Sequence, residues 1–295
     1  MSIGFAIEEP RTVSAALELL GEGDETVRAI GGGTGLSLLM KYGFFEPTTL
    51  VSLRHLGPEL AGIDVTEGGG LRLGAMTTLR DLEDSAEVAQ RAPLLRHALK
   101  VLATIRLRNM AQLGGAIAHG HPQMDTPPVL LALNARVRVA SHRGERSIDA
   151  ADLFLGYYET AVEDDELILD VTIDPLGSHR AAYRKIPARA VDDWPMLGVA
   201  AIGMRTDGRV SDLRVAVGAL TDRAQRLPVA EEALVGTAGS AADIEAAASA
   251  AADSIDYHDS SSASAAYQRH IVAVHVRRAL DEVLASTDGS TSKGR

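Results

Sequence analysis

The stretch from residue 27 to residue 36 reads Val27-Arg28-Ala29-Ile30-Gly31-Gly32-Gly33-Thr34-Gly35-Leu36. Its apolar start predicts a short buried strand over 27–30, and residues 36–41 predict a turn of helix beyond the glycines. Glycines allow positive φ and let backbone N–H groups approach an anion closely, and the Thr34 hydroxyl adds a donor. The stretch therefore predicts a compact β-α-β opening whose loop suits a diphosphate.

Two standard phosphate-binding motifs are absent from this loop. A Walker loop ends in Gly-Lys-Ser/Thr, and Lys41 lies too far along the chain. A Rossmann fingerprint has glycine at its first, third and sixth positions, and the sixth residue counted from Gly31 is Leu36. Taken alone, the loop is equally compatible with a tight turn that binds no ligand.

A second glycine-rich segment makes a ligand the better explanation. It reads Arg108-Asn109-Met110-Ala111-Gln112-Leu113-Gly114-Gly115-Ala116-Ile117-Ala118-His119 and is followed by Pro122 and Asp125. A basic, amide-rich approach ends in paired glycines, which we interpret as a second loop. One ligand held between two such loops from different lobes would be a dinucleotide. A second, unrelated turn is the weaker alternative.

His119, His121 and Asp125 are also compatible with a metal site, because imidazoles and carboxylates are metal ligands. The remaining histidines form no matching cluster, and His pairs in loops are more often hydrogen-bonding groups. We therefore expect no metal at these residues.

A third group of residues combines aromatic and charged side chains. Tyr183-Arg184-Lys185 is followed by Arg189, Asp192, Asp193 and Trp194. An aromatic side chain can lie against a redox-active ring, and a neighbouring cation can stabilise negative charge on the reduced ring. The alternative is a strand with a solvated charged face. No Ser-His-Asp or paired-carboxylate arrangement stands out, and Asp164-Asp165 is interpreted as a surface turn.

Composition limits the class of protein. The 295 residues suggest two domains or one large domain in lobes, and the 46% of apolar residues can form a full core. The net charge of -11 argues against nucleic acid as a partner. The chain has no cysteine, so it cannot itself ligate a cysteine-held iron–sulfur cluster. It shows neither a signal segment nor a long apolar run, so we expect a cytoplasmic protein without a transmembrane segment.

Periodicity predicts further elements along the chain. Thr12 is a candidate N-cap for a helix that ends at Gly21, and residues 174–177 form a turn at a plausible domain boundary. Strands are expected over 50–53, 71–75, 137–140, 167–173, 199–204 and 213–220. Helices are expected over 92–103, 151–158, 229–234, 241–253 and 264–284.

Given these motifs, the chain resembles the FAD-binding (medium) subunit of the molybdenum hydroxylase family, of the xanthine dehydrogenase and aerobic carbon monoxide dehydrogenase type. Residues 31–36 are similar to the family's Ala-Gly-Gly-Thr/Gln-Asp/Ser-Leu loop. Residues 104–125 are similar to its Val-Arg-Asn…Thr-Ile-Gly-Gly-Asn/Ser-Leu-Ala…Asp-Pro…Asp segment. The similarity continues through residues 71–78, 183–185, 189–193 and 265–280, and covers roughly residues 5 to 285.

The resemblance implies an α+β fold. Residues 1–176 would form a two-lobed FAD-binding domain of the vanillyl-alcohol-oxidase type, with lobes over about residues 1–57 and 58–176. Residues 177–285 would form the small α+β C-terminal domain of carbon monoxide dehydrogenase flavoproteins, and residues 286–295 a disordered tail. FAD would lie between the lobes and the C-terminal domain.

The resemblance also implies cofactor-binding residues. The diphosphate would be held by Gly31 to Leu36 and by residues 114–116, and the isoalloxazine would be flanked by Ile168 and Lys185. Asp125 would bind on the adenosine side, and Asp192 would sit on a loop near the flavin. The full expected set is Gly31, Gly32, Gly33, Thr34, Gly35, Leu36, Thr77, Ala111, Gly114, Gly115, Ala116, His119, Asp125, Ile168, Tyr183, Lys185 and Asp192.

Four positions depart from the family pattern. Gln112 replaces the usual Thr, Ala116 replaces Asn or Ser, Gly35 replaces Asp or Ser, and His121 stands where Asp often precedes Pro. Each change removes or alters a polar contact, so we expect weaker FAD binding than is usual in the family. His119, Gln112 or Thr34 would compensate.

The function implied by the resemblance is electron transfer within a complex. A large subunit would carry the molybdenum cofactor and a small subunit the 2Fe-2S clusters, in a dimer of heterotrimers. Electrons would pass through FAD to NAD, quinone or dioxygen. Two other interpretations are a stand-alone flavin oxidoreductase of the same fold and a non-catalytic binding module with decayed loops.

Overall fold

The computed structural model describes residues 4–259 and 263–285. The expected tail at 286–295 lies outside the described residues. The first sheet is parallel, in the order β1-β3-β2, and is flanked by short helices. Its elements are β1 (Ala6–Glu8), α1 (Val13–Glu22), β2 (Val27–Ile30), α2 (Leu36–Lys41), β3 (Thr49–Ser52) and α3 (Gly57–Leu60).

The sequence predicted most of this first lobe. Thr12 caps α1 by accepting a hydrogen bond from the Ala15 N–H at 3.2 Å. The helix passes Gly21 and ends at Glu22 with Gly23 as its C-cap, so the end predicted at Gly21 was wrong by one residue. The predicted bounds of β2 and α2 are confirmed. The glycine loop therefore begins directly at the end of β2.

A five-stranded antiparallel sheet forms the centre of the second lobe, in the order β4-β5-β10-β6-β7. Its strands are β4 (Ile63–Val65), β5 (Leu71–Gly74), β6 (Arg136–Ser141), β7 (Gly144–Asp149) and β10 (Leu167–Ile173). Its helices are α4 (Leu79–Asp84), α5 (Ala86–Arg91), α6 (Pro93–Val101), α7 (Ile105–Arg108), α8 (Leu113–Ala118), α9 (Thr126–Ala132) and α10 (Ala150–Leu153). One face of the sheet packs on these helices, and the other, through Leu167 and Leu169, packs on the first lobe.

Two local predictions in the second lobe were wrong. The expected glycine loop at 113–115 is the first turn of α8, because the N–H groups of Leu113 and Gly114 are already bonded to the preceding loop and the helix starts from there. The helix expected over 151–158 stops at Leu153. It gives way to a hairpin of β8 (Phe154–Gly156) and β9 (Glu159–Thr160), because Tyr158 adopts a left-handed φ of 58° that no helix allows.

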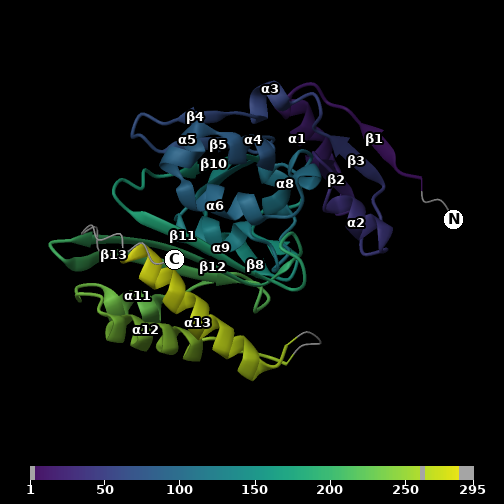
Figure 1. Cartoon of the computed structure of the whole chain (residues 1–295). Helices are drawn as coiled ribbons and strands as arrows, with labels where there is room; N and C mark the ends of the chain where they lie inside the picture. The colour runs from purple at the N-terminus through teal and green to yellow at the C-terminus, as the bar shows by residue number, and fades with distance from the viewer. Residues whose placement is uncertain (1–3, 260–262, 286–295) are drawn as a thin grey trace.

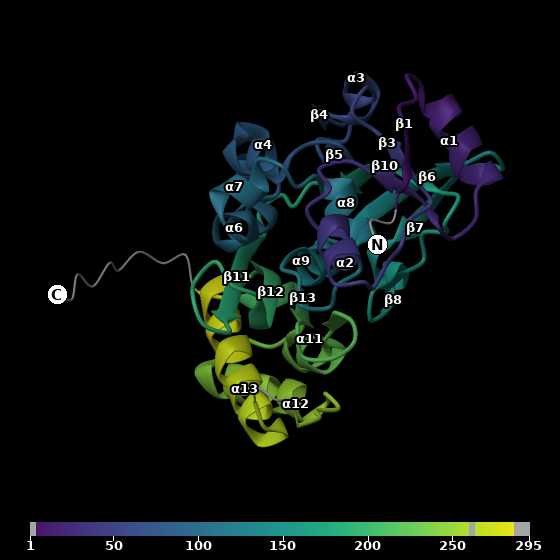
Figure 2. The same cartoon turned by 90° about the vertical axis from the view of Figure 1, so that its right-hand side faces the viewer.

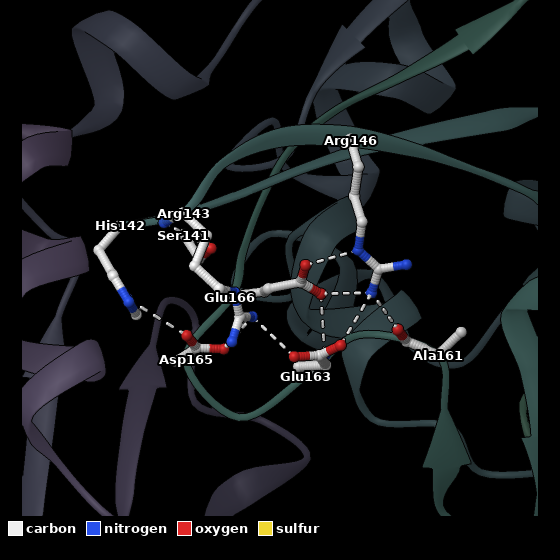
Figure 3. Close-up of polar contacts among 8 residues, drawn as sticks. All are labelled: Ser141, His142, Arg143, Arg146, Ala161, Glu163, Asp165 and Glu166. Atoms are coloured by element: carbon white, nitrogen blue, oxygen red, sulfur yellow. Dashed lines mark hydrogen bonds and ion pairs between the residues drawn. The ribbon is translucent and has the colours of Figure 1, made fainter.

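Ion pairs tie the loop before β10 to the β6–β7 hairpin. Arg146 contacts Glu166 at 2.6 Å, and Arg143 contacts Glu163 and Asp165 at 2.6 and 2.9 Å (Figure 3). Asp164, in the same loop, pairs with Arg28 of β2 at 2.8 Å. Residues 164–165 form the surface turn that the sequence predicted, and their ion pairs link the two lobes.

The C-terminal domain is a four-stranded antiparallel sheet in the order β11-β12-β13-β14, with helices on both faces. Its elements are β11 (Arg180–Pro187), β12 (Pro195–Thr206), β13 (Arg209–Gly218), β14 (Gln225–Arg226), α11 (Pro228–Leu234), α12 (Ala241–Asp253) and α13 (Ala265–Val283). Figures 1 and 2 show α11, α12 and α13 below the sheet and α6 and α9 of the second lobe above it. The sheet is thus shared by two cores, which holds the C-terminal domain against the second lobe.

Candidate functional site

The glycine loop after β2 presents a row of free donors. Within the described part of the chain, none of the six backbone N–H groups from Gly31 to Leu36 donates a hydrogen bond. The loop turns through Gly33, whose φ is 68°, and α2 continues from it. Unpaired N–H groups at a protein surface carry partial positive charge and favour an anion. The loop therefore has the unpaired donors that an anion-binding nest needs, and we call residues 31–36 the nest.

The second lobe forms the opposite wall of this nest. A Cβ built on Gly32 would overlap the Met110 carbonyl oxygen, and one built on Gly31 would overlap the Gln112 side-chain oxygen. A Cβ on Gly35 would come within 2.9 Å of the His119 Nδ1 atom. Residues 31–35 and 110–119 therefore touch, and only glycine allows the approach. The sequence-based expectation that both segments meet at one place agrees with this contact.

The 110–119 segment uses its backbone mainly to hold itself in place. The N–H groups of Leu113 and Gly114 donate to the carbonyls of Thr77 and Ala75 at 3.1 and 2.7 Å. The Ala111 carbonyl accepts the Leu79 N–H at 2.9 Å. These bonds fasten the segment to the loop between β5 and α4, so its position is fixed before any ligand binds.

Gly114 and Gly115 have different surroundings although they are adjacent. A Cβ on Gly114 would lie 2.8 Å from the Ala75 Cβ, so Gly114 serves close packing. Gly115 is exposed, a Cβ on it would meet nothing within 4 Å, and its N–H has no partner among the described residues. Ala116 is buried, and its N–H bonds to the Gln112 carbonyl at 2.9 Å. Within 114–116, Gly115 thus offers the free donor.

Thr77 is buried, and its hydroxyl is fully occupied. It donates to the Gly62 carbonyl at 3.0 Å and accepts the Gly62 N–H at 2.9 Å. In this structure Thr77 therefore links the start of β4 to the loop that carries residues 110–119. Its observed contacts are structural.

A buried polar group joins the second lobe to the C-terminal domain. The Tyr183 hydroxyl donates to Asp125 Oδ1 at 2.7 Å, and the Lys185 ammonium lies 3.1 Å from Asp125 Oδ2. Lys185 also donates to the Val101 carbonyl at 2.9 Å. The side chains of Lys185 and Asp125 are 4% and 5% exposed, so the charges compensate each other away from water.

The protonation states at this group follow from burial. Burial raises the pKa of Asp125, although the Lys185 charge and the hydrogen bond from Tyr183 act in the opposite direction. Burial, together with the Asp125 charge, raises the pKa of Tyr183 well above its usual value. Tyr183 is thus a neutral donor to Asp125, and the Lys185 charge favours the ionised form of that carboxyl.

An aromatic cluster lies beside the nest and was not predicted as a unit. Its members are His119, His121, Tyr157, Tyr158 and Trp194. The His121 and Trp194 rings stack with centroids 4.5 Å apart, and Tyr158 packs edge-on against both histidines at 5.1 and 4.9 Å. The cluster joins the α8–α9 loop, the β8–β9 hairpin and the β11–β12 loop. The missed signal was Tyr157-Tyr158, which the sequence placed in a helix.

The two histidines are neutral at ordinary pH. Burial lowers the pKa of His119, and burial and the neighbouring His119 lower the pKa of His121 to about 4. The His121 Nδ1 atom accepts the Gln123 N–H at 3.0 Å, which requires an unprotonated nitrogen. Asp125 is committed to Tyr183 and Lys185, and the residues that the structure describes contain no metal-binding group of three or more acidic, His or Cys side chains.

Two expected site residues lie apart from these contacts. Ile168 is buried in the core of the second lobe, on the face of β10 that packs on the helices. Asp192 is exposed on the β11–β12 loop, two residues before Trp194, and no hydrogen bond or ion pair within residues 4–259 and 263–285 links it to the rest of the site.

The fold and the nest define a class: a two-lobed FAD-binding domain followed by a small α+β flavoprotein domain. Residues 3–175 match the family model described as the FAD binding domain in molybdopterin dehydrogenase. Residues 181–283 match the model of the CO dehydrogenase flavoprotein C-terminal domain. The chain belongs to this family of FAD-binding medium subunits of molybdenum-containing oxidoreductases.

Individual relatives agree with this assignment over nearly the whole chain. The nicotine 6-hydroxylase medium subunit of Paenarthrobacter nicotinovorans is 36% identical, with 94% of this chain and 96% of the relative covered. The carbon monoxide dehydrogenase medium chain of Hydrogenophaga pseudoflava is 32% identical, with 95% and 97% covered.

Solved structures from the same family have the same fold. The carbon monoxide dehydrogenase of Hydrogenophaga pseudoflava matches with a TM-score of 0.91 and 33% identity over 95% of this chain and 97% of that one. The quinoline 2-oxidoreductase of Pseudomonas putida 86 matches with a TM-score of 0.90 and 27% identity over 96% and 98%. The expected fold class is therefore confirmed.

Proposed function

We propose that this chain is the electron-transfer subunit of a heteromeric molybdenum hydroxylase, taking electrons from iron–sulfur clusters and delivering them through FAD to an external acceptor. The observation that carries the proposal is the nest of six unpaired N–H groups at residues 31–36, closed on one side by the second lobe. Such a nest fits a diphosphate, and FAD is the diphosphate ligand of the matched family.

The residues present fit this cofactor. Gly31 to Leu36 and Gly115 would donate to the diphosphate, with Gln112 and His119 close enough to loop glycines to add side-chain donors. Asp125, Tyr183 and Lys185 would lie on the side of the C-terminal domain. Ala111, Gly114, Ala116 and Thr77 would support the loops, and Ile168 and Asp192 stay predicted contacts. Bound FAD would supply the exchange between one-electron and two-electron transfer.

The partner subunits belong to the same proposal. The relatives are named as medium subunits or medium chains, which supports a complex of several subunits. Without a cysteine, this chain needs a partner to carry the 2Fe-2S clusters, and a large subunit would carry the molybdenum cofactor. We propose a dimer of heterotrimers, with NAD, quinone or dioxygen as acceptor. No helix among the described residues is long and apolar enough to cross a membrane.

We also propose the division of the chain. The FAD-binding domain would cover residues 1–176, with lobes meeting near residue 57, and the C-terminal domain residues 177–285. The parallel first sheet ends before residue 57, and the matched family regions, 3–175 and 181–283, leave a gap at the proposed boundary.

Purification of the native complex tests the function. We expect this chain to copurify with two further subunits, to show the visible absorbance bands of oxidised flavin, and to bring molybdenum and iron with it. A yellow chain that purifies alone and oxidises an organic substrate would contradict the proposal in favour of a stand-alone oxidoreductase. A colourless chain that takes up no added FAD would contradict it in favour of a binding module.

A further inference from the structure

The open edge of the C-terminal sheet is unusually basic for this acidic protein. β11 is the edge strand of its sheet among the described residues, with α6 above it and α13 below it (Figure 2). Five basic or titratable side chains line this edge, in a chain whose net charge is -11. We call them the basic edge: His97, Lys100, Arg184, His275 and Arg278.

The side chains of the basic edge share one electrostatic environment. Burial lowers the pKa of His97, the positive charges of Lys100 and Arg96 lower it further, and Glu282 opposes them. Burial also lowers the pKa of His275, with Arg278 and Arg184 adding to the effect. Cations on both sides of β11 thus act on their neighbours, which marks a locally positive surface.

One ion pair offsets part of the positive charge at this edge. Arg184 pairs with Glu282 at 2.7 Å, but Lys100 and Arg278 are exposed and form no ion pair within the described part of the chain. The Arg184 Nε and His275 Nδ1 atoms are buried and have no hydrogen-bond partner among the described residues. The exposed cations Lys100 and Arg278 are therefore the groups of this edge that an acidic partner could reach.

Protection against aggregation does not explain this arrangement. Charged residues on an edge strand discourage pairing with other chains. Here most of the charge lies on the flanking helices, on α6 above and α13 below, rather than on β11 itself. Cations on both sides of an unpaired strand are instead suited to an extended segment that carries carboxylates and adds to the sheet edge.

We propose that the basic edge docks an acidic, extended segment of the iron–sulfur partner subunit. This inference rests on the proposed function for the existence of that partner. Successive residues of a strand point to opposite faces: Arg184 faces Glu282 of α13, while Lys185 reaches the Val101 carbonyl of α6 and Asp125 of the proposed FAD site. A partner on this edge would therefore contact the strand that carries Lys185, one of the residues proposed to lie beside the flavin.

The test uses the full FAD-loaded chain and the purified iron–sulfur subunit of its own complex. The variant Lys100→Glu/Arg278→Glu reverses two exposed charges of the basic edge. We expect about tenfold or greater loss of affinity at low salt, measured by calorimetry, and a flatter dependence on salt concentration. The matched control, Arg11→Glu/Arg209→Glu, reverses two exposed charges elsewhere and should bind like the wild type.

Hydrogen exchange gives a second measurement. Binding of the iron–sulfur subunit should protect amides within residues 180–187 in the wild type and much less in the basic-edge variant. Equal affinity of the variant and the wild type, or no protection of β11 on binding, would overturn the docking surface while the proposed function stands. If the wild type itself binds neither subunit of the complex, the proposed function fails as well. Protection of β11 by the large subunit or by a second copy of this chain alone would also overturn the inference.

Discussion

Residues 31–36 and the group Asp125–Tyr183–Lys185 belong to one proposed site. Their polar atoms differ in whether they already have hydrogen-bond partners within the protein. The N–H groups of the glycine loop have no partner among the described residues, whereas the carboxylate, hydroxyl and ammonium of the buried group already bond to one another. A free donor can bond to a ligand without the loss of an existing hydrogen bond. A buried ion pair has to be broken or reoriented first, which is unfavourable.

This difference distinguishes residues that would bind the ligand from residues that hold the two domains together. The loop fits a ligand-binding role, and its substitution should change FAD affinity. The buried group joins α9 and α6 of the second lobe to β11, so its substitution should first change the stability of the domain junction. Substitutions in the loop and in the buried group should therefore differ in whether they change FAD affinity or stability.

The largest effect is expected at Lys185. Lys185→Met leaves Asp125 charged and buried beside Tyr183, which should lower the free energy of unfolding by about 3–5 kcal/mol. Chemical denaturation of the apoprotein measures this loss. The double variant Asp125→Asn/Lys185→Met removes both charges and should recover part of it, because no buried charge is left unpaired.

Substitution of Lys185 also tests whether one residue can both stabilise the domain junction and act on the flavin. We hypothesise that its charge stabilises the reduced, anionic flavin, so the midpoint potential of Lys185→Ala should fall relative to the wild type. The Asp125 charge, 3.1 Å away, offsets part of the Lys185 charge, so we expect a modest shift. An unchanged potential with a large loss of stability would assign Lys185 entirely to the domain junction.

The next effect is expected at Gly32. A methyl group in Gly32→Ala would overlap the Met110 carbonyl, so the two lobes must move apart, which is unfavourable by about 1–3 kcal/mol. Because the same movement spreads the donors of the nest, the purified protein should contain little FAD. Flavin absorbance per chain measures this. Gly43→Ala is a poor control because Gly43 has a φ of 72°, whereas Gly57→Ala meets open space and should keep its FAD.

Substitutions at Gly115 and Gly114 should have smaller effects on stability, and these effects should be opposite in sign. Gly115→Ala adds a methyl group in open space within a helix, so it should stabilise the apoprotein by about 0.5–1 kcal/mol. If its free N–H faces the diphosphate, the same methyl should weaken FAD binding by about tenfold, or about 1.4 kcal/mol. Gly114→Ala, crowded by Ala75, should lose stability instead. Unchanged FAD affinity in Gly115→Ala would remove this residue from the binding site.

The elements that sequence predicted well are those whose signals are local. Helix α12 starts at a capping box between Ser240 and Asp243, and its predicted bounds, 241–253, are confirmed. The predicted bounds of β10, a strand over 167–173 that is apolar except for Asp170 and Thr172, are confirmed too. In both, residues within a few positions of each other determine the element.

The features that sequence missed depend on distant contacts. Paired glycines disfavour a helix, yet α8 begins at Leu113 because Thr77 and Ala75, more than thirty residues earlier, accept its first N–H groups. Asp125 and Lys185 were expected at different parts of FAD, but a pairing across 60 residues of sequence has no signature in spacing. Nor does the pattern show that Gln112 and His119 pack on Gly31 and Gly35.

The smallest effect concerns His121, which packs beside the nest yet has its acceptor nitrogen satisfied by Gln123. Its pKa falls from an ordinary value of 6.5 to about 4 in the folded protein, mainly through burial. Between pH 6.5 and 4 the unfolded chain therefore binds a proton that the folded chain does not, so His121 makes stability rise with pH across this window. Above 6.5 both states are neutral, and the contribution no longer changes.

His121→Asn removes this titration while its side-chain oxygen can still accept the Gln123 N–H. As the pH falls from 6.5 to 4, we expect the Tm of the wild type to drop more than that of the variant, by on the order of 2 °C. His119 is present in both proteins, so its own titration cancels in the comparison. Parallel Tm profiles would show that the His121 ring is solvated, and the aromatic cluster would then be an open surface beside the nest instead of a packed wall.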